Sequence, residues 1–225
     1  MTLRSRFFAM TYDRQIARSE KAGLRTLRQG LLAAAKGHVI EIGGGTGANL
    51  SFYGPGVESL TVTEPEQPML SRLQRKVQDQ IPSAKVLRAP AEDLPFEDNT
   101  FDVAVSTLVL CGVDDQPRAL RELRRVLRPG GQFLFLEHVR SDDPSWARLQ
   151  DRMNWINRLV VCCDCNRPTL ASIEAAGFAI THLEHTSLPK APKFARPTIV
   201  GTAAAPLARD PDRTGPARGT GRVIS

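Results

Sequence analysis

The chain has 225 residues, 41% of them hydrophobic, and a formal net charge of +6, values ordinary for a single globular domain. The positive charge lies at the two ends, where residues 1–30 carry seven Lys/Arg against two acids and residues 206–225 carry four Arg against two Asp. The body is therefore close to neutral, which argues against a nucleic-acid groove across it, and no stretch approaches the ~18 apolar residues of a membrane span.

Residues 1–36 mix basic and apolar positions at roughly helical spacing and predict two amphipathic helices. Charges interrupt the apolar core that a signal peptide would need, so we expect a cytoplasmic protein with no transmembrane segment. The basic residues fit either a solvated helix face or contact with an anionic lipid or acceptor.

An apolar run at Val39–Ile42 leads into glycines at positions 43, 44, 45 and 47. Gly43, Gly45 and Gly47 remove side chains where a chain turns tightly, takes positive φ and approaches a bound molecule closely. A dinucleotide-binding turn usually reads GxGxxG and holds a pyrophosphate. Here Glu41 stands just before the turn, and its carboxylate would repel phosphate and favour an amine.

A second apolar run, Leu60–Thr63, ends at Glu64, which lies 23 positions after Glu41. In a doubly wound sheet an acid at about this spacing lies beside the ribose hydroxyls of a nucleotide-type cofactor. Without the glycine turn before it, Glu64 would fit a solvated carboxylate in a turn equally well.

Further strand-sized and helix-sized segments alternate along the chain and predict parallel strands with right-handed crossovers. The remaining predicted strands are 85–87, 101–107, 132–137, 178–184 and 198–203. The predicted helices are 47–52, 67–80, 116–127, one containing Trp146 and Trp155, and 169–176. Pro129-Gly130-Gly131 is expected to stop the helix before the fifth strand.

Four sequence blocks, together with Glu64, resemble the class I S-adenosylmethionine-dependent methyltransferases, and within them the branch of mammalian thiol methyltransferases and their bacterial relatives. The blocks are Glu-Ile-Gly-Gly-Gly-Thr-Gly-Ala-Asn from Glu41, Ser-Thr-Leu-Val-Leu-Cys from Ser106, Arg-Arg-Val-Leu-Arg-Pro-Gly-Gly from Arg124, and Glu-His-Val from Glu137. The resemblance spans about residues 25–205.

The resemblance implies a Rossmann-like α/β fold with a seven-stranded, mostly parallel sheet of order 3-2-1-4-5-7-6 and helices on both faces. Residues 1–36 would form an amino-terminal helical lid, and residues 37–205 the S-adenosylmethionine-binding domain. Residues 206–225 are rich in Pro, Gly, Arg and Asp with few apolar residues, so we expect a disordered tail.

The resemblance also implies that the cofactor is S-adenosylmethionine, with S-adenosylhomocysteine as the product. Glu41 would lie near its methionine moiety and Glu64 at its ribose. The other expected cofactor residues are Gly43, Gly44, Gly45, Gly47, Pro65, Met69, Ala91, Glu92, Thr107 and Leu108. The resemblance places Pro65 and Met69 along the adenosine, and the others lie outside the carboxyl ends of the strands, where ligands bind; for Glu92, a solvated loop acid is the alternative.

The sequence offers several candidate residues for the acceptor side of the site. His138, directly after the fifth strand, is the best-placed base because its ordinary pKa is near 6.5, although a structural histidine fits as well. Asp164 is the second candidate base, and Arg167 either holds an acceptor carboxylate or forms a salt bridge. Tyr12 and Trp146 are candidate apolar walls.

Cys163 and Arg167 match the branch's Gly-Cys-x-x-x-Arg segment, but Cys162 replaces its glycine, and Asp164, Cys165 and Pro168 are unusual there. Three cysteines within four positions lack the second Cys-x-x-Cys pair of a zinc site, so no metal is expected.

The sequence therefore predicts a methyltransferase acting on a small, fairly apolar acceptor, with thiol sulfur favoured. O-, N- or C-methylation of an aromatic natural product or quinone stays open, as does a cofactor-binding protein without catalysis. A small-molecule acceptor is the expected partner, no nucleic acid is expected, and the protein is expected to be a monomer or homodimer.

Overall fold

The structure is a computed structural model that describes residues 13–207 except 15 and 162, without the side chains of 160 and 161. The first part of the expected lid, with Tyr12, and most of the expected tail lie outside the described residues. The strands are β1 (Gly37–Ile42), β2 (Val57–Thr63), β3 (Lys85–Leu87), β4 (Phe101–Thr107), β5 (Leu127–His138), β6 (Ala179–Ser187) and β7 (Pro197–Ala204).

The strands form one sheet in the order β3-β2-β1-β4-β5-β7-β6, which confirms the predicted topology. Neighbouring strands from β3 to β5 pair in parallel, whereas β7 pairs antiparallel with both β5 and β6. The strand order reverses between β1 and β4, which leaves a crevice at their carboxyl ends where ligands bind in sheets of this kind.

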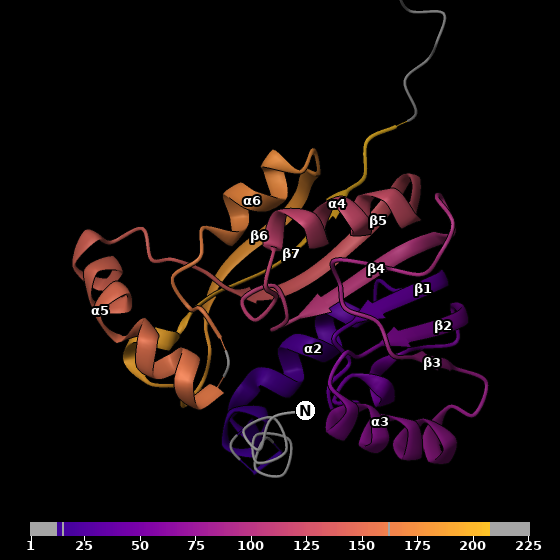
Figure 1. The fold of residues 1–225 in the computed structure, drawn as a ribbon, viewed down its shortest axis with the longest axis horizontal. Coiled ribbons are helices and arrows are strands. Elements are labelled where there is room, and N and C mark those ends of the chain that lie inside the picture. Colours follow the sequence, from indigo (N-terminus) through magenta and orange to yellow (C-terminus); the bar gives the residue numbers. More distant parts are fainter. Residues whose placement is uncertain (1–12, 15, 162, 208–225) are drawn as a thin grey trace, which may run out of the picture.

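Helices cover both faces of this sheet (Figure 1). They are η1 (Glu20–Leu24), α2 (Arg25–Leu32), η2 (Leu50–Phe52), α3 (Gln67–Gln80), α4 (Gln116–Val126), α5 (Pro144–Val161), α6 (Thr169–Ala175) and η3 (Lys193–Ala195). One hydrophobic core joins α4 and α6 to the sheet, and a second joins α2 and α3 to its other face. Helix α5 lies beyond the carboxyl ends of the strands.

Alternation of side chains along each strand produces the two cores. In β1, Ile40 and Ile42 enter the core under α4, while Val39, directly before Ile40, enters the core under α2. The apolar runs seen in the sequence are therefore strands buried on both faces, as parallel sheets require.

Several predicted boundaries were wrong; strand β2, for example, begins at Val57 and not at Leu60. The helix expected at residues 47–52 is only the single 3₁₀ turn η2, because Gly47 has a φ of +76° that a right-handed helix does not allow. The helix predicted at 116–127 ends at Val126, before Pro129. The strand predicted to begin at residue 132 already begins at Leu127. Within the described part of the chain, no helix is long and apolar enough to cross a membrane.

Candidate active site

The glycine turn follows β1 at the reversal of strand order. Gly43, Gly45 and Gly47 have φ values of +57°, +56° and +76°, in the left-handed region that favours glycine, as their spacing predicted. Within the described residues, a Cβ added at Gly45 would meet one atom within 4 Å, the Gly43 carbonyl oxygen at 4.0 Å. The backbone at Gly45 is therefore accessible to a ligand.

The other turn glycines are required by packing inside the protein. A Cβ on Gly43 would lie 2.6 Å from Val109 Cγ1, one on Gly47 would lie 2.8 Å from Leu50 Cδ1, and one on Gly44 would clash with Val62. Three glycines of the turn thus pack against β2, η2 and the loop after β4, and Gly45 faces outward.

Glu64 lies at the end of β2 and fixes this turn. Its Oε2 accepts a hydrogen bond from the Gly45 amide at 2.8 Å, and its Oε1 accepts one from the Glu66 amide at 2.9 Å. Burial raises the pKa of Glu64, and these two bonds offset part of the rise. Each carboxylate oxygen keeps a second lone pair, so the group is still able to accept ligand hydroxyls.

Glu41 is buried, with 2% of its surface exposed, and has two side-chain donors. Asn49 Nδ2 donates to Oε1 at 2.9 Å, and the Tyr53 hydroxyl donates to Oε2 at 2.5 Å. Burial raises the pKa of Glu41 to about 7, although these bonds and the Arg28 charge act to lower it. Glu41 therefore changes protonation state near neutral pH and is ready to receive a cation.

Arg28, from α2, completes this cluster and was not identified from the sequence. It is 2% exposed; its Nη1 donates to Asn49 Oδ1 at 2.9 Å and to Thr107 Oγ1 at 2.7 Å, and its Nε pairs with Glu20 at 2.9 Å. The signal was present, because position 28 shares a helix face with buried Leu24 and Leu31, and a charge on an apolar face must be paired.

Thr107 and Leu108 lie at the end of β4, facing the glycine turn. Thr107 Oγ1 accepts from both Arg28 and Asn49, and Leu108 has a φ of +61°, a strained value for a branched residue. Arg28, Glu41, Gly45, Asn49 and Thr107 line a hollow of about 20 Å³. The sequence-predicted residues on β1 and β4 are thus brought together with the unpredicted Arg28.

The residues expected along the adenosine lie at the ends of β2 and β3. Pro65 is exposed and its carbonyl accepts from Arg88, while Met69 and Ala91 are buried. The Glu92 carboxylate is not free, because its Oε1 accepts from the amides of Asp114 and Asp115 at 2.8 and 3.2 Å. Its side chain therefore holds the loop before α4, which leaves its backbone to contact a ligand.

His138 is the last residue of β5 and is in contact with two cysteines. Its Nδ1 lies 3.5 Å from Cys111 Sγ and 3.3 Å from Cys163 Sγ, and its Nε2 is buried without a hydrogen-bond partner. Burial lowers the pKa of His138, but the Cys111 contact, the Glu137 charge and the Ala195 backbone together outweigh it and leave the pKa raised. Contact with Cys163 and burial raise the pKa of Cys111 well above its ordinary value.

Asp164 and Arg167 pair with each other at 2.8 Å, which is the salt-bridge alternative predicted for Arg167. Asn154 donates to the second Asp164 oxygen at 2.8 Å, and Arg167 also donates to the Leu110 carbonyl at 3.1 Å. Burial raises the pKa of Asp164, but Arg167 and Asn154 together lower it below its ordinary value. Both groups are thus committed to holding the Leu110 and Cys163 segments together.

Glu137 has a supporting position that the sequence did not reveal. It is fully buried, and its Oε1 accepts from the Ser106 hydroxyl at 2.5 Å and from the Val109 amide at 3.0 Å. Burial raises the pKa of Glu137 despite these bonds. The two neighbouring residues therefore have different roles: Glu137 fixes the loop after β4, and His138 contacts the thiols.

Trp146, in α5, is 38% exposed and lines a surface hollow of about 350 Å³. The other lining residues are mostly polar and charged, among them Arg140, Asp142, Lys193 and Arg196. No residue lines both this hollow and the one at the glycine turn. The structure therefore does not bring Trp146 together with the expected cofactor residues, and Tyr12 lies outside the described residues.

Comparison with known proteins agrees with this geometry. The methyltransferase domain family matches residues 40–135, which include the glycine turn, Glu64 and Thr107. The chain is 32% identical over 202 residues to the thiol S-methyltransferase TMT1A of Homo sapiens, covering 87% of this chain and 82% of that protein.

Two further similarities extend this result. The ubiquinone/menaquinone biosynthesis C-methyltransferase UbiE of Idiomarina loihiensis is 38% identical over 104 residues, which are 44% of this chain and 41% of UbiE. The crystal structure of the YcgJ protein from Bacillus subtilis has a similar fold, with a TM-score of 0.66 at 19% identity over 81% of this chain and 98% of YcgJ.

Proposed function

The chain belongs to the S-adenosylmethionine-dependent methyltransferases, and from this premise we propose that it transfers a methyl group to the sulfur of a small, fairly apolar thiol. The observation that carries the choice of sulfur is the similarity to a human thiol S-methyltransferase over 82% of that protein's length. The methyl donor is S-adenosylmethionine and the product S-adenosylhomocysteine.

The residues at the glycine turn fit the amino-acid end of this cofactor, which carries an ammonium and a carboxylate group. Glu41 supplies a buried carboxylate for the ammonium, and Arg28 supplies a buried guanidinium for the carboxylate. The open backbone at Gly45 allows close approach, because no side chain of the residues that the structure describes lies within 4 Å of a Cβ placed there. When bound, the cofactor supplies the reactive sulfonium methyl group.

The nucleoside end of the cofactor would extend towards β2 and β3. Glu64 would accept hydrogen bonds from the ribose hydroxyls with its unused lone pairs. Pro65 and Met69 would lie along the adenosine, with the Ala91 and Glu92 backbone at the adenine and Thr107 and Leu108 on the opposite wall. This assignment uses the carboxyl edge of each strand from β1 to β4.

The protein's own contribution is to align the acceptor, exclude water and remove one proton. A thiol needs little activation because it becomes a strong nucleophile once ionised. We place the acceptor sulfur on the side of His138 and Cys163, where the segment resembling the thiol methyltransferases lies. In this arrangement Asp164 and Arg167 position the Cys163 segment, and Trp146 and Tyr12 remain candidate contacts for the acceptor.

A C-methyltransferase acting on a quinone is the second candidate function. The specific observation in its favour is the 38% identity to UbiE, which covers less than half of either chain. Carbon methylation needs an electron-rich ring carbon and a base for its proton, so phenols and hydroquinones are the acceptors that discriminate this candidate from the first.

The test is to incubate purified protein with methyl-labelled S-adenosylmethionine and a matched panel of alkyl thiols, phenols, hydroquinones and amines. We expect label in thioethers and little in the other products. Label found only in phenols or ring carbons would overturn the choice of sulfur. Reactions without protein control for spontaneous methylation of thiols.

A further inference from the structure

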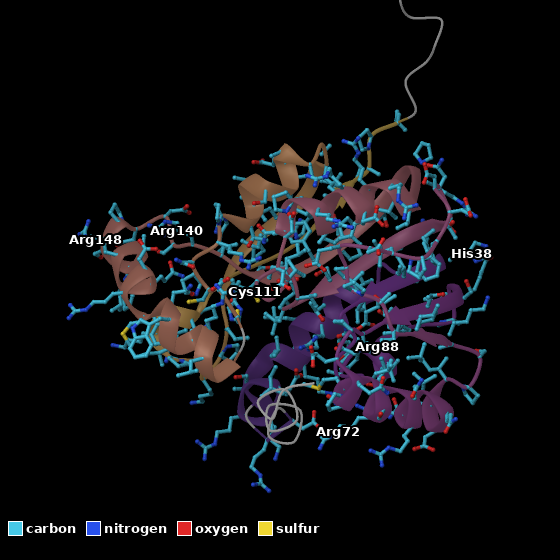
Figure 2. All side chains as sticks on the ribbon, viewed as in Figure 1. His38, Arg72, Arg88, Cys111, Arg140 and Arg148 are labelled. Atoms are coloured by element: carbon cyan, nitrogen blue, oxygen red, sulfur yellow. The ribbon has the colours of Figure 1, made fainter. Side chains whose placement is uncertain are left out.

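Three side chains far apart in the sequence meet at the carboxyl edge of the sheet. Cys111 follows β4, His138 ends β5, and Cys163 follows α5. Figure 2 labels Cys111 between the sheet and α5, where the sulfur atoms gather. All three residues are buried, at 1%, 8% and 7% exposure.

The distances among the donor atoms match those of zinc ligands. A tetrahedral zinc ion with Zn–S bonds of about 2.3 Å and Zn–N bonds of about 2.0–2.1 Å holds a sulfur and a nitrogen about 3.6 Å apart. His138 Nδ1 lies 3.5 Å from Cys111 Sγ and 3.3 Å from Cys163 Sγ. The three ligand atoms all lie within 4.8 Å of one another.

The backbone holds each of these residues in place. The carbonyl of Cys111 accepts from the Asp164 amide at 2.8 Å, and that of Cys163 accepts from Asn157 Nδ2 at 2.8 Å. The carbonyl of His138 accepts from Thr169 Oγ1 at 3.0 Å. Such support from neighbouring residues is what orients metal ligands before the metal arrives.

Apolar packing does not account for the histidine. Among the described residues its Nε2 is buried without a close hydrogen-bond partner, the Ala195 backbone interacts with the ring only weakly, and its Nδ1 faces two thiols, which are weak hydrogen-bond donors. An ordinary buried imidazole would have a stronger partner on at least one nitrogen. A metal ion bonded to Nδ1 would satisfy the side of the ring that faces the thiols.

We propose that Cys111, His138 and Cys163 bind one zinc ion through two sulfurs and Nδ1, with no ligand from the described residues at the fourth position. Thiolate and imidazole ligands select zinc over calcium or magnesium, and three protein ligands with an open position are typical of catalytic zinc sites. Cys165, also buried, is directed to Asn154 Oδ1 at 3.7 Å and lies outside the cluster.

The sequence predicted no metal site, whereas the structure brings three metal-ligating side chains together. That expectation considered only the spacing of Cys162, Cys163 and Cys165, whereas the ligands come from three separate segments. Their proximity depends on the pairing of β4 with β5 and on the return of the chain after α5.

The open position would bind the acceptor, a role that rests on the proposed function. A thiol binding there loses its proton to solvent, and its sulfur lone pair forms the new bond to the methyl carbon. The sulfonium–methyl bond of the cofactor breaks, and its electron pair stays on the sulfur of S-adenosylhomocysteine. The neutral thioether product is a weaker zinc ligand than the thiolate and leaves.

The experiment uses the full chain, reduced, stripped with a chelator and reloaded with zinc or cobalt. We expect about one zinc ion per chain by elemental analysis and a thiolate-to-cobalt charge-transfer band. Cys111→Ser and Cys163→Ser should lose most of the metal, whereas the matched control Cys165→Ser should keep it. Circular dichroism and cofactor binding verify that each variant is folded.

Wild-type protein that binds S-adenosylmethionine but takes up neither metal would overturn the zinc site, as would a Cys111–Cys163 disulfide that persists under reducing conditions. Loss of metal in Cys165→Ser would overturn the open fourth position. The proposed function is judged separately. Thiol methylation at an unchanged rate by metal-free Cys111→Ser would remove zinc from catalysis and leave that function intact, while a zinc-loaded protein that methylates no thiol would contradict that function alone.

Discussion

At the scale of single residues, Glu41 makes cofactor binding depend on pH. Its pKa of about 7 arises from burial, and the groups that face it are Tyr53, Asn49, Arg28 and Glu64. The free protein therefore holds Glu41 mostly protonated at pH 5.5, whereas the cofactor ammonium favours the carboxylate. Binding releases a proton, so the affinity rises as the pH rises.

We expect the affinity for S-adenosylmethionine to rise about tenfold between pH 5.5 and 7, a range in which the cofactor amino group, with a pKa near 8, stays protonated. Calorimetry in buffers of different ionisation enthalpy measures both the affinity and the released proton. Glu41→Gln should bind more weakly at pH 7 and lose most of this pH dependence. An unchanged pH profile in this variant would remove Glu41 from the ammonium site.

Gly45 provides a second prediction at this scale. Its φ of +56° and the open space above it are what a closely bound ligand requires, and a β-branched side chain satisfies neither. Gly45→Val should lower the cofactor affinity at least tenfold while costing ~1–2 kcal/mol of stability for a left-handed residue. Isothermal calorimetry and thermal unfolding measure the two effects. Tight binding by the folded variant would show that the ligand does not approach this backbone.

At the scale of helices and strands, residues whose pattern is local were well predicted. Helix α3 and strands β3 and β4 have the predicted bounds, because apolar periodicity and flanking turn residues fix both of their ends. The helix expected at residues 47–52 was wrong, because the same glycines that signal a ligand-binding turn also prevent a helix.

The residues of the candidate site that were predicted are those whose role shows in a single segment of the chain. Glu41, Glu64 and the glycines lie next to strands that the sequence reveals, and the sheet brings them together as expected. The positions of Arg28 and of the Cys111–His138–Cys163 cluster depend on how distant segments pack. The spacing of residues along the chain carries no information about that packing. A buried charge on an apolar helix face was the one local signal available.

Helix α2 offers a test of the element itself. Gly30 lies in this helix, is exposed, and an added Cβ would meet nothing within 4 Å. Gly30→Ala should therefore stabilise the protein by ~0.5–1 kcal/mol through helix propensity and a smaller loss of backbone entropy. The midpoint of thermal unfolding should rise by about 1–4 °C.

Gly23→Ala is the matched comparison for this variant. Gly23, inside η1, has a φ of +133°, which interrupts the helical backbone before α2, so the same substitution there should lower the midpoint. Equal effects of the two substitutions would contradict the helix break.

At the scale of the whole molecule, the cofactor site joins the two halves of the fold. Arg28 comes from α2, in the core on one face, while Glu41 and Thr107 come from central strands that pack into both cores. A ligand held by these residues stabilises the sheet together with the helix that covers it. Cofactor binding should therefore be visible as a shift in global unfolding.

A ligand at one hundred times its dissociation constant adds about 2.7 kcal/mol to the free energy of unfolding. For a chain of this length we expect S-adenosylhomocysteine to raise the unfolding midpoint by about 5–10 °C, measured by calorimetry at fixed protein concentration. Gly45→Val binds at least tenfold more weakly, so at the same ligand concentration its shift should be at most about half of the wild-type shift, although its own transition is cooperative. If the ligand left the wild-type unfolding midpoint unchanged, the turn, Arg28 and Glu41 would not form a cofactor site, because a ligand bound there is lost when the sheet unfolds.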